Sequence, residues 1–112
     1  MIRVREIDHV VLRVADLAVS ERFYGVLGLT FTREKHGRGP EHLSAESNGV
    51  VLELYPRGER STADVRLGFH VPSLAVILSR VAECGGNVVS LTDGHAVVAD
   101  PDGHRIELRA RD

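Results

Sequence analysis

The chain contains an internal repeat, and this repeat is the feature that most limits what it can fold into. Moving residues 14–28 forward by 57 positions, and residues 49–54 forward by 54, places identical residues on one another. The identical pairs are Val14/Val71, Leu17/Leu74, Ala18/Ala75, Val19/Val76, Gly28/Gly85, Gly49/Gly103, Glu53/Glu107 and Leu54/Leu108. Chance rarely supplies that many identities in matching elements, so the chain consists of two copies of one unit.

Each copy shows the same order of predicted elements: one strand, one helix and three further strands. Each helix has an N-cap residue (Asp16, Ser73) before apolar residues at helical spacing, and glycine at its end. The strands are recognised by their valine- and leucine-rich alternation, and Asn48-Gly49 is a strong tight-turn signal. Strands are predicted at residues 7–14, 29–35, 41–46 and 50–55, and again at 65–71, 87–91, 95–99 and 104–110.

The length and composition fit one small globular domain. A chain of 112 residues can bury one core but is too short for two independent domains. We therefore expect a single domain over residues 1–112, with module one at about 7–55, a linker at 56–64 and module two at about 65–110. The hydrophobic share of 43% and the charged share of 27% are ordinary for a globular protein. A net charge of -2 argues against a nucleic-acid partner.

Three features bear on the location of the protein in the cell. No apolar run approaches the roughly 20 residues that span a bilayer, so no membrane partner is expected. Residues 1–5 lack the apolar core of a signal peptide. Cys84 is the only cysteine, which excludes a disulfide within the chain and favours a packing role in a reducing compartment. We expect a cytoplasmic protein.

Alternation along the strands sorts their residues onto two faces. The apolar face, which we expect to pack on the helices, carries Val10, Leu12, Val14, Leu52, Leu54, Leu67, Phe69, Val71, Ile106 and Leu108. The polar face carries His9, Arg13, Glu53, Tyr55, Arg66, His70, Arg105, Glu107 and Arg109. A solvated sheet face is one interpretation of the second set, and the lining of a pocket between two curled sheets is the other.

The repeat places ionisable residues at equivalent points of the polar face. His9 corresponds to Arg66, and Glu53 corresponds to Glu107. Glutamate is a poor strand former, yet it stands amid apolar residues in both last strands. One histidine and two glutamates at symmetric points are the residue types that hold a divalent cation.

The sequence resembles the vicinal oxygen chelate superfamily of glyoxalase I, bleomycin-resistance and fosfomycin-resistance proteins, methylmalonyl-CoA epimerase and extradiol dioxygenases. The resemblance covers nearly the whole chain. It rests on Ile7-Asp8-His9-Val10, Phe23-Tyr24 before Leu27-Gly28-Leu29, Leu52-Glu53-Leu54, and Asp100-Pro101-Asp102-Gly103-His104 before Ile106-Glu107-Leu108. It implies an α+β fold in which two paired βαβββ modules form a cupped mixed β-sheet. It does not name a reaction, because function lies in the site rather than in the fold.

The resemblance also implies where a metal would bind. Metal-dependent members hold the cation with residues at the positions of His9, Glu53, Arg66 and Glu107. The family has histidine where this chain has Arg66, and a guanidinium is not a metal ligand. His70 lies on the same strand face but about 13 Å away, too far to replace it. We expect Arg66 to neutralise Glu53 or Glu107, and the metal centre to be degenerate.

Two functions are favoured, and the sequence does not decide whether the protein is an enzyme; a third role, as a structural or regulatory partner of another protein, has no positive sign in the sequence. The first is a binding protein of the bleomycin-resistance kind that needs no cofactor and binds a small anionic molecule through Arg66, Arg13, His70 and Tyr55. The second is a metal-dependent lyase, isomerase or dioxygenase that uses His9, Glu53 and Glu107 to hold nickel, zinc, manganese or iron.

The remaining expectations concern assembly and the other histidines. A single module cannot close a cup over its polar face, and family members pair modules within or across chains, so we expect a homodimer. His36, His42 and His95 are expected to be solvated in or beside polar loops, and His104 to be a turn-exit residue.

Overall fold

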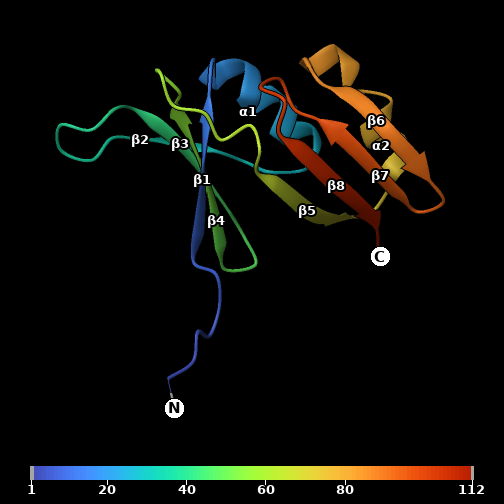
Figure 1. The fold of residues 1–112 in the computed structure, drawn as a ribbon, viewed down its shortest axis with the longest axis horizontal. Coiled ribbons are helices and arrows are strands. Elements are labelled where there is room, and N and C mark those ends of the chain that lie inside the picture. The colour runs from blue at the N-terminus through green and yellow to red at the C-terminus, as the bar shows by residue number, and fades with distance from the viewer. Residues whose placement is uncertain (1, 112) are drawn as a thin grey trace.

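The computed structural model describes residues 2–111, which form two four-stranded sheets, one for each sequence repeat (Figure 1). Module one contains β1 (His9–Val14), α1 (Leu17–Val26), β2 (Thr32–Glu34), β3 (His42–Ser47) and β4 (Val50–Pro56). Module two contains β5 (Arg66–Val71), α2 (Leu74–Leu78), the 3₁₀ helix η1 (Ala82–Cys84), β6 (Asn87–Thr92), β7 (His95–Ala99) and β8 (Arg105–Ala110). The α+β class and the repeated βαβββ order are confirmed.

The two sheets have the same topology. Their strand orders are β1-β4-β3-β2 and β5-β8-β7-β6. The first and last strands of each module pair in parallel, and the other neighbours pair antiparallel. The helix after the first strand belongs to the long connection that brings the chain back to form this parallel pair. Each sheet therefore has one face toward the helices and one face free of them.

The boundaries differ from the sequence prediction in both modules. β2 is shorter than predicted, because Leu29 and Phe31 pack against the core before the strand begins. α2 stops at Leu78, and η1 follows it before Gly85, whose φ of 84° ends the helical segment. Among residues 2–111, no helix is long and apolar enough to cross a membrane.

The predicted apolar face forms the core. Its members are buried or partly buried, and Phe23 and Tyr24 of α1 pack against them. Asp16 caps α1 as predicted, since its carboxylate accepts the N–H of Val19 at 3.1 Å. Ser73 occupies the equivalent position before α2 but makes no side-chain cap bond, and α2 is the shorter helix. One of the two predicted side-chain caps therefore forms.

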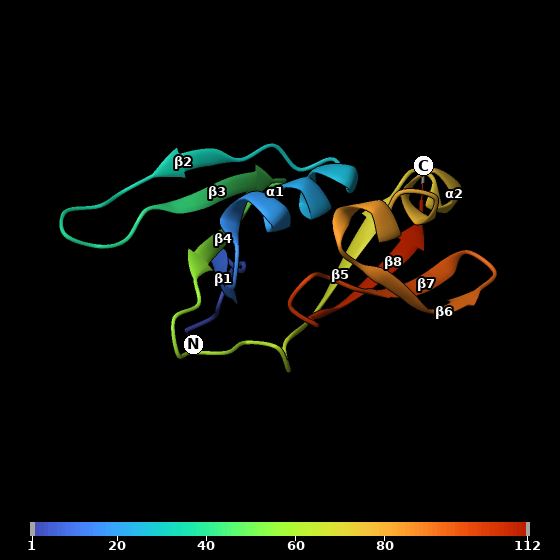
Figure 2. The ribbon, with the colours of Figure 1, turned by 90° about the horizontal axis from the view of Figure 1, so that it is seen from above.

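The modules meet where α1 lies against the β7–β8 turn and η1 (Figures 1 and 2). The hydroxyl of Tyr24 donates to Asp100 at 2.6 Å, and the N–H of Ala15 donates to Asp102 at 2.8 Å. A Cβ added at Gly86 would lie 2.5 Å from Phe23 Cε1 and 2.5 Å from the Ala99 carbonyl oxygen. Only glycine allows so close an approach between the two modules.

A buried polar network stabilises this junction. His104 is fully buried, with Nδ1 2.7 Å from Asp100 Oδ2 and Nε2 2.6 Å from the hydroxyl of Thr62. Burial raises the pKa of Asp100, but hydrogen bonds with His104 and Tyr24 outweigh it, so that pKa lies below its usual range. Burial raises the pKa of Tyr24, and the charge of Asp100 raises it further. His104 thus follows the turn as expected, and its ring contacts both Thr62 of the linker and Asp100 of the β7–β8 turn.

Candidate functional site

The polar face of module one carries a row of four side chains, one from each strand. Glu34 pairs with His42 across β2 and β3, and Arg13 pairs with Tyr55 across β1 and β4. His42 Nε2 lies 3.4 Å from Glu34 Oε1, and its ring stacks on Tyr55 at 4.2 Å and 7°. The Arg13 guanidinium lies 5.1 Å from the Tyr55 ring centroid, in the range of a cation–π contact.

Module two carries the equivalent row with different chemistry. Strand pairing aligns Thr92 with His95, His95 with Arg109, and Arg109 with His70. Through the repeat, Arg109 replaces the phenol of Tyr55, and His70 replaces Arg13. Module two therefore has the positively charged side chain of Arg109 at the position where module one has the aromatic ring of Tyr55.

Both central glutamates lie beside a histidine. Glu53 Oε2 is 3.4 Å from His42 Nε2, and Glu107 Oε1 is 3.3 Å from His95 Nε2. Glu107 Oε2 is also 3.3 Å from Arg66 Nη1. Hydrogen bonds from Arg66 and His95 hold the pKa of Glu107 below its usual range. Arg66 thus pairs with Glu107, one of its two expected partners.

The positions that the resemblance assigns to a metal lie in two half-sites. His9 is half exposed, and its Nδ1 is 2.8 Å from Asp8 Oδ2. Within residues 2–111, no hydrogen bond or ion pair links His9 or Glu53 to Arg66 or Glu107. Glu107 is neutralised by a guanidinium that cannot bind a metal. The residues at these positions do not fit the family's metal centre.

The expected ligand-binding residues also divide between the modules. Arg13 and Tyr55 contact each other in module one. Arg66 and His70 lie on β5 of module two, where His70 helps to line a pocket of about 280 Å³. The other residues that line this pocket are Gly68, Phe69, Glu107 and Arg109.

Sequence reasoning missed two histidines at the centre of these faces. The expectation that His42 and His95 are solvated is wrong, because their side chains are 1% and 28% exposed. The expectation is right for His36, which is 72% exposed. A signal was present: His42 precedes Glu53 by 11 positions and His95 precedes Glu107 by 12. The repeat aligns the two histidines only if one residue is inserted in module two, and their positions beside polar loops also hid the match; in the structure His42 lies on Tyr55 and His95 pairs with Arg109, the residue equivalent to Tyr55.

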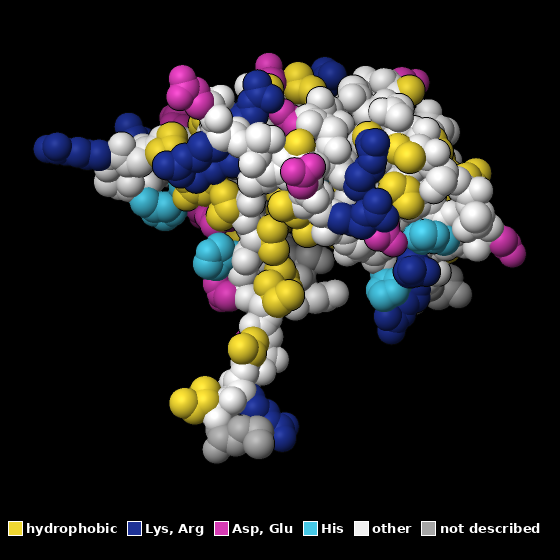
Figure 3. Space-filling model, in the orientation of Figure 1, with side chains coloured by type: hydrophobic (Ala, Val, Ile, Leu, Met, Phe, Trp, Pro, Cys, Tyr) yellow, Lys and Arg dark blue, Asp and Glu magenta, His cyan; other side chains and the backbone are white. Residues whose placement is uncertain are grey.

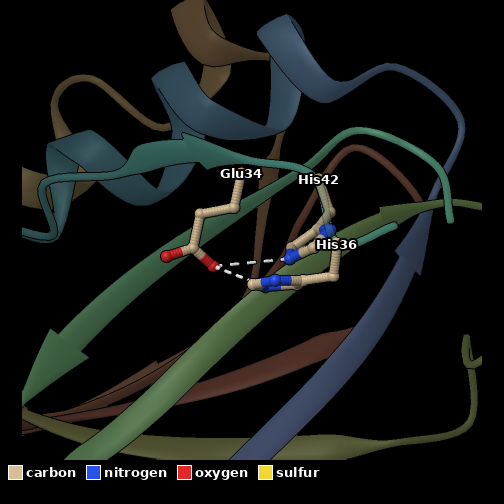
Figure 4. A group of neighbouring side chains, drawn as sticks. All are labelled: Glu34, His36 and His42. Carbon is tan, nitrogen blue, oxygen red and sulfur yellow. Dashed lines mark ion pairs between the residues drawn. The ribbon is translucent and has the colours of Figure 1, made fainter. Parts of the chain in front are cut away.

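His42 also belongs to a cluster with Glu34 and His36 (Figure 4). One ligand atom from each of the three residues lies within 4.8 Å of the others. Imidazole nitrogen and carboxylate oxygen are donors that suit a divalent cation. The sequence analysis assigned none of these three residues to a site.

Comparison with known proteins supports this architecture. The chain is 33% identical to a "Probable lactoylglutathione lyase" of Vibrio parahaemolyticus, over 89% of this chain and 86% of the relative. A protein of the same name from Synechocystis is 32% identical, over 89% of this chain and 91% of the relative.

Solved structures show the same fold at lower identity. The trypanothione-dependent glyoxalase I of Leishmania major superposes with a TM-score of 0.74 at 24% identity, over 96% of this chain and 87% of that chain. An antibiotic-binding protein from Streptomyces sp. CB03234 superposes with a TM-score of 0.72 at 19% identity, over the full length of both chains. The model of one family matches residues 6–108. The chain therefore belongs to the Glyoxalase/Bleomycin resistance protein/Dioxygenase superfamily.

Proposed function

We propose that the protein binds a small anionic molecule on the polar faces of its sheets, and that the family's metal position is degenerate. The observation that carries this proposal is the contact between Arg66 Nη1 and Glu107 Oε2 at 3.3 Å. Arg66 stands where the resemblance places a histidine ligand, and a guanidinium offers no lone pair to a metal. The positive charge of Arg66 also neutralises the Glu107 carboxylate, which a bound metal ion would need as a ligand.

The pocket of module two supports an anionic ligand. Gly68 lies opposite Glu107 and has no side chain, which leaves the sheet surface open beside His70. The Arg109 guanidinium is 60% exposed and is 4.0 Å from Glu107, so it remains accessible to a ligand. An arginine can bind a carboxylate through two charge-assisted hydrogen bonds. Arg66 extends the positive charge along the same face.

Module one adds a second part to the proposed site. The ring of Tyr55 lies between the His42 ring and the Arg13 guanidinium. An aromatic surface beside a cation suits a ligand that has an apolar body as well as an acidic group. Arg13 and Tyr55 are therefore retained as ligand-binding residues in this proposal.

We further propose that a homodimer brings the two half-sites together. Apolar side chains are exposed on the N-terminal arm and on the edge strand β6, and Figure 3 shows the arm extending away from the sheets. These residues are Ile2, Val4 and Ile7 on the arm, and Val88, Val89 and Leu91 on β6. Exposed apolar surface of this kind is typical of protein interfaces. Light scattering that gives only the monomer mass of 12.3 kDa at every concentration would contradict the dimer.

A metal-dependent enzyme is the second candidate, and the names of the relatives favour it. The two curated relatives from Vibrio parahaemolyticus and Synechocystis are each named "Probable lactoylglutathione lyase". In this alternative, His9, Glu53 and Glu107 hold the metal with three protein ligands. Activity on a hemithioacetal that requires added divalent metal, and that disappears with Glu107→Gln, would support the enzyme over the binding protein.

The anion proposal is tested by calorimetry and thermal shift against matched ligands. Small carboxylic and keto acids should bind and raise the melting temperature, whereas their neutral amides and cationic amines should not. Arg66→Gln should weaken acid binding by about tenfold, the loss of one charge-assisted contact. Arg22→Gln, an exposed arginine on α1, changes the net charge equally and should have no effect. Equal binding of acids and amides, or acid binding that survives Arg66→Gln, would contradict the proposal.

A further inference from the structure

We propose that Glu34, His36 and His42 form a binding site for a divalent cation of the zinc type, with a different set of ligands from the position that the family resemblance assigns. Glu34 Oε1 lies 3.4 Å from His42 Nε2 and 3.5 Å from His36 Nε2 (Figure 4). Direct N–H···O hydrogen bonds are usually near 2.9 Å, so both distances are long. Two ligands about 2.1 Å from a tetrahedral metal lie roughly 3.4 Å apart. The observed spacing matches a shared cation better than two hydrogen bonds.

The β2–β3 hairpin positions the three ligands. Antiparallel pairing sets Glu34 directly opposite His42, and the connecting loop brings the His36 ring to 5.1 Å from the His42 ring. The hairpin is held by the ion pair of Arg33 with Glu41 at 3.0 Å. The ligands therefore come from one short segment of the chain, and binding requires no rearrangement of distant elements.

The orientation of the His42 ring supports a cation at Nε2. Its Nδ1 lies 3.2 Å from the carbonyl oxygen of Pro40. A neutral ring that donates from Nδ1 presents a lone pair at Nε2, and there Nε2 is 3.4 Å from both Glu34 Oε1 and Glu53 Oε2, with the Tyr55 hydroxyl farther away at 3.5 Å. A lone pair facing two carboxylates is unfavourable without a cation between them. A backbone carbonyl that fixes the other ring nitrogen is also the usual arrangement for a metal-bound histidine.

Charge and exposure define the class of ion. Glu34 and Glu53 together offer two negative charges, which a divalent cation neutralises. Two imidazoles and one carboxylate suit zinc and its neighbours cobalt and nickel more than magnesium or calcium, which prefer oxygen ligands. His36 is 72% exposed, so the outer side of the cluster is open to water or to a further ligand.

The test uses full-length protein that has been stripped with a chelator and dialysed. Zinc is titrated by calorimetry, and cobalt by its visible absorption, which reports the geometry of bound metal. We expect one equivalent to bind the unmodified protein. His36→Gln and Glu34→Gln should each lower the affinity by at least about tenfold. Both side chains are exposed or partly exposed, so these variants should fold, which circular dichroism checks.

Matched controls distinguish this site from other modes of binding. His70→Gln removes an exposed histidine from module two, and Glu59→Gln removes an exposed glutamate from the linker, so both should leave the affinity unchanged. His9→Gln and Glu107→Gln should also leave it unchanged, because they alter only the family position. Loss of metal with His9→Gln or Glu107→Gln, but not with His36→Gln, would overturn the inference. Absence of zinc binding, or equal binding by all variants, would also overturn it.

Discussion

The two modules share one sheet topology and one pattern of strand pairing, yet their polar faces differ. Each face has a glutamate next to a histidine, at 3.4 Å in module one and 3.3 Å in module two. In module one the histidine is buried against Tyr55, whereas in module two His95 is 28% exposed beside Arg109. Both modules therefore have the glutamate–histidine contact, but the residues around it differ.

The connecting loops explain much of this difference. Residues 35–41 join β2 to β3, and this loop brings His36 against the His42 ring (Figures 1 and 4). Only Asp93 and Gly94 join β6 to β7, so nothing comparable covers His95. Two faces with the same strand order therefore offer different chemistry, because loop length decides which side chains reach the sheet.

The largest expected difference in stability lies between Asp100, which begins the β7–β8 turn, and its repeat equivalent Glu46, which lies near the end of β3. Asp100 is buried with His104 and Tyr24, whereas Glu46, 54 positions earlier, is exposed. Asp100→Ala leaves His104 buried without its partner and should lower the free energy of unfolding by about 3–5 kcal/mol. Glu46→Ala should change it by less than about 0.5 kcal/mol. Urea denaturation measures both, and similar values would show that the junction is not a stabilising contact.

Alanine substitutions of the two equivalent histidines, His42 and His95, should differ by less in their cost in unfolding free energy. His42→Ala removes a ring that is stacked and almost fully buried, and should cost about 2–3 kcal/mol of unfolding free energy. His95→Ala removes a partly exposed ring and should cost about 1 kcal/mol or less. The experiment is chemical denaturation in the presence of a chelator. An equal cost would contradict the role given to the loop of residues 35–41.

A substitution at Arg66 should bring module two closer to the family's metal centre. In a His36→Gln background, Arg66→His supplies the ligand type that the resemblance expects and should raise nickel affinity by about tenfold. Arg105→His is the matched control, because Arg105 pairs with Arg66 on the neighbouring strand. Calorimetry measures both. An unchanged affinity would show that Arg66 is not what separates this chain from its metal-binding relatives.

The smallest expected effect is on the pH dependence of stability in acid, through Glu107 of module two. The pKa of Glu107 is lowered in the folded protein by Arg66 and His95. This carboxylate therefore stabilises the fold above its unfolded pKa of about 4.3, and the contribution is lost as the pH falls through the lower folded value. Glu107→Gln should flatten the decline in stability below about pH 5. Glu46→Gln changes the net charge equally and serves as the control in urea titrations at each pH.

Much of the fold could be predicted because it depends on local and periodic signals. The Asp16 cap and the apolar alternation follow from neighbouring residues, and the repeat follows from a constant spacing along the chain; the structure confirms all three. The pairing of Arg66 with Glu107 was among the expected outcomes because both lie on the polar face of module two.

The remainder of the site depends on contacts between segments. The pattern of β3 is weak in the sequence and His42 stands beside a polar loop, so a solvated side chain was expected, and only the folded hairpin shows that His42 lies beside Glu34 and Tyr55. Likewise, serine is a good N-cap in general, yet Ser73 makes no side-chain cap bond in its folded surroundings. Neither outcome follows from residue type or from periodicity.

The linker has a consequence for how the molecule unfolds. The hydroxyl of Thr62 accepts the backbone N–H of Arg13 at 2.9 Å and lies 2.6 Å from the ring of His104. One oxygen atom therefore joins the first strand of module one to the buried network of module two. Opening either module breaks a bond on which the other depends, which couples the two sheets into one cooperative unit. We therefore expect the two modules, although they are copies of one unit, to unfold together in a single transition.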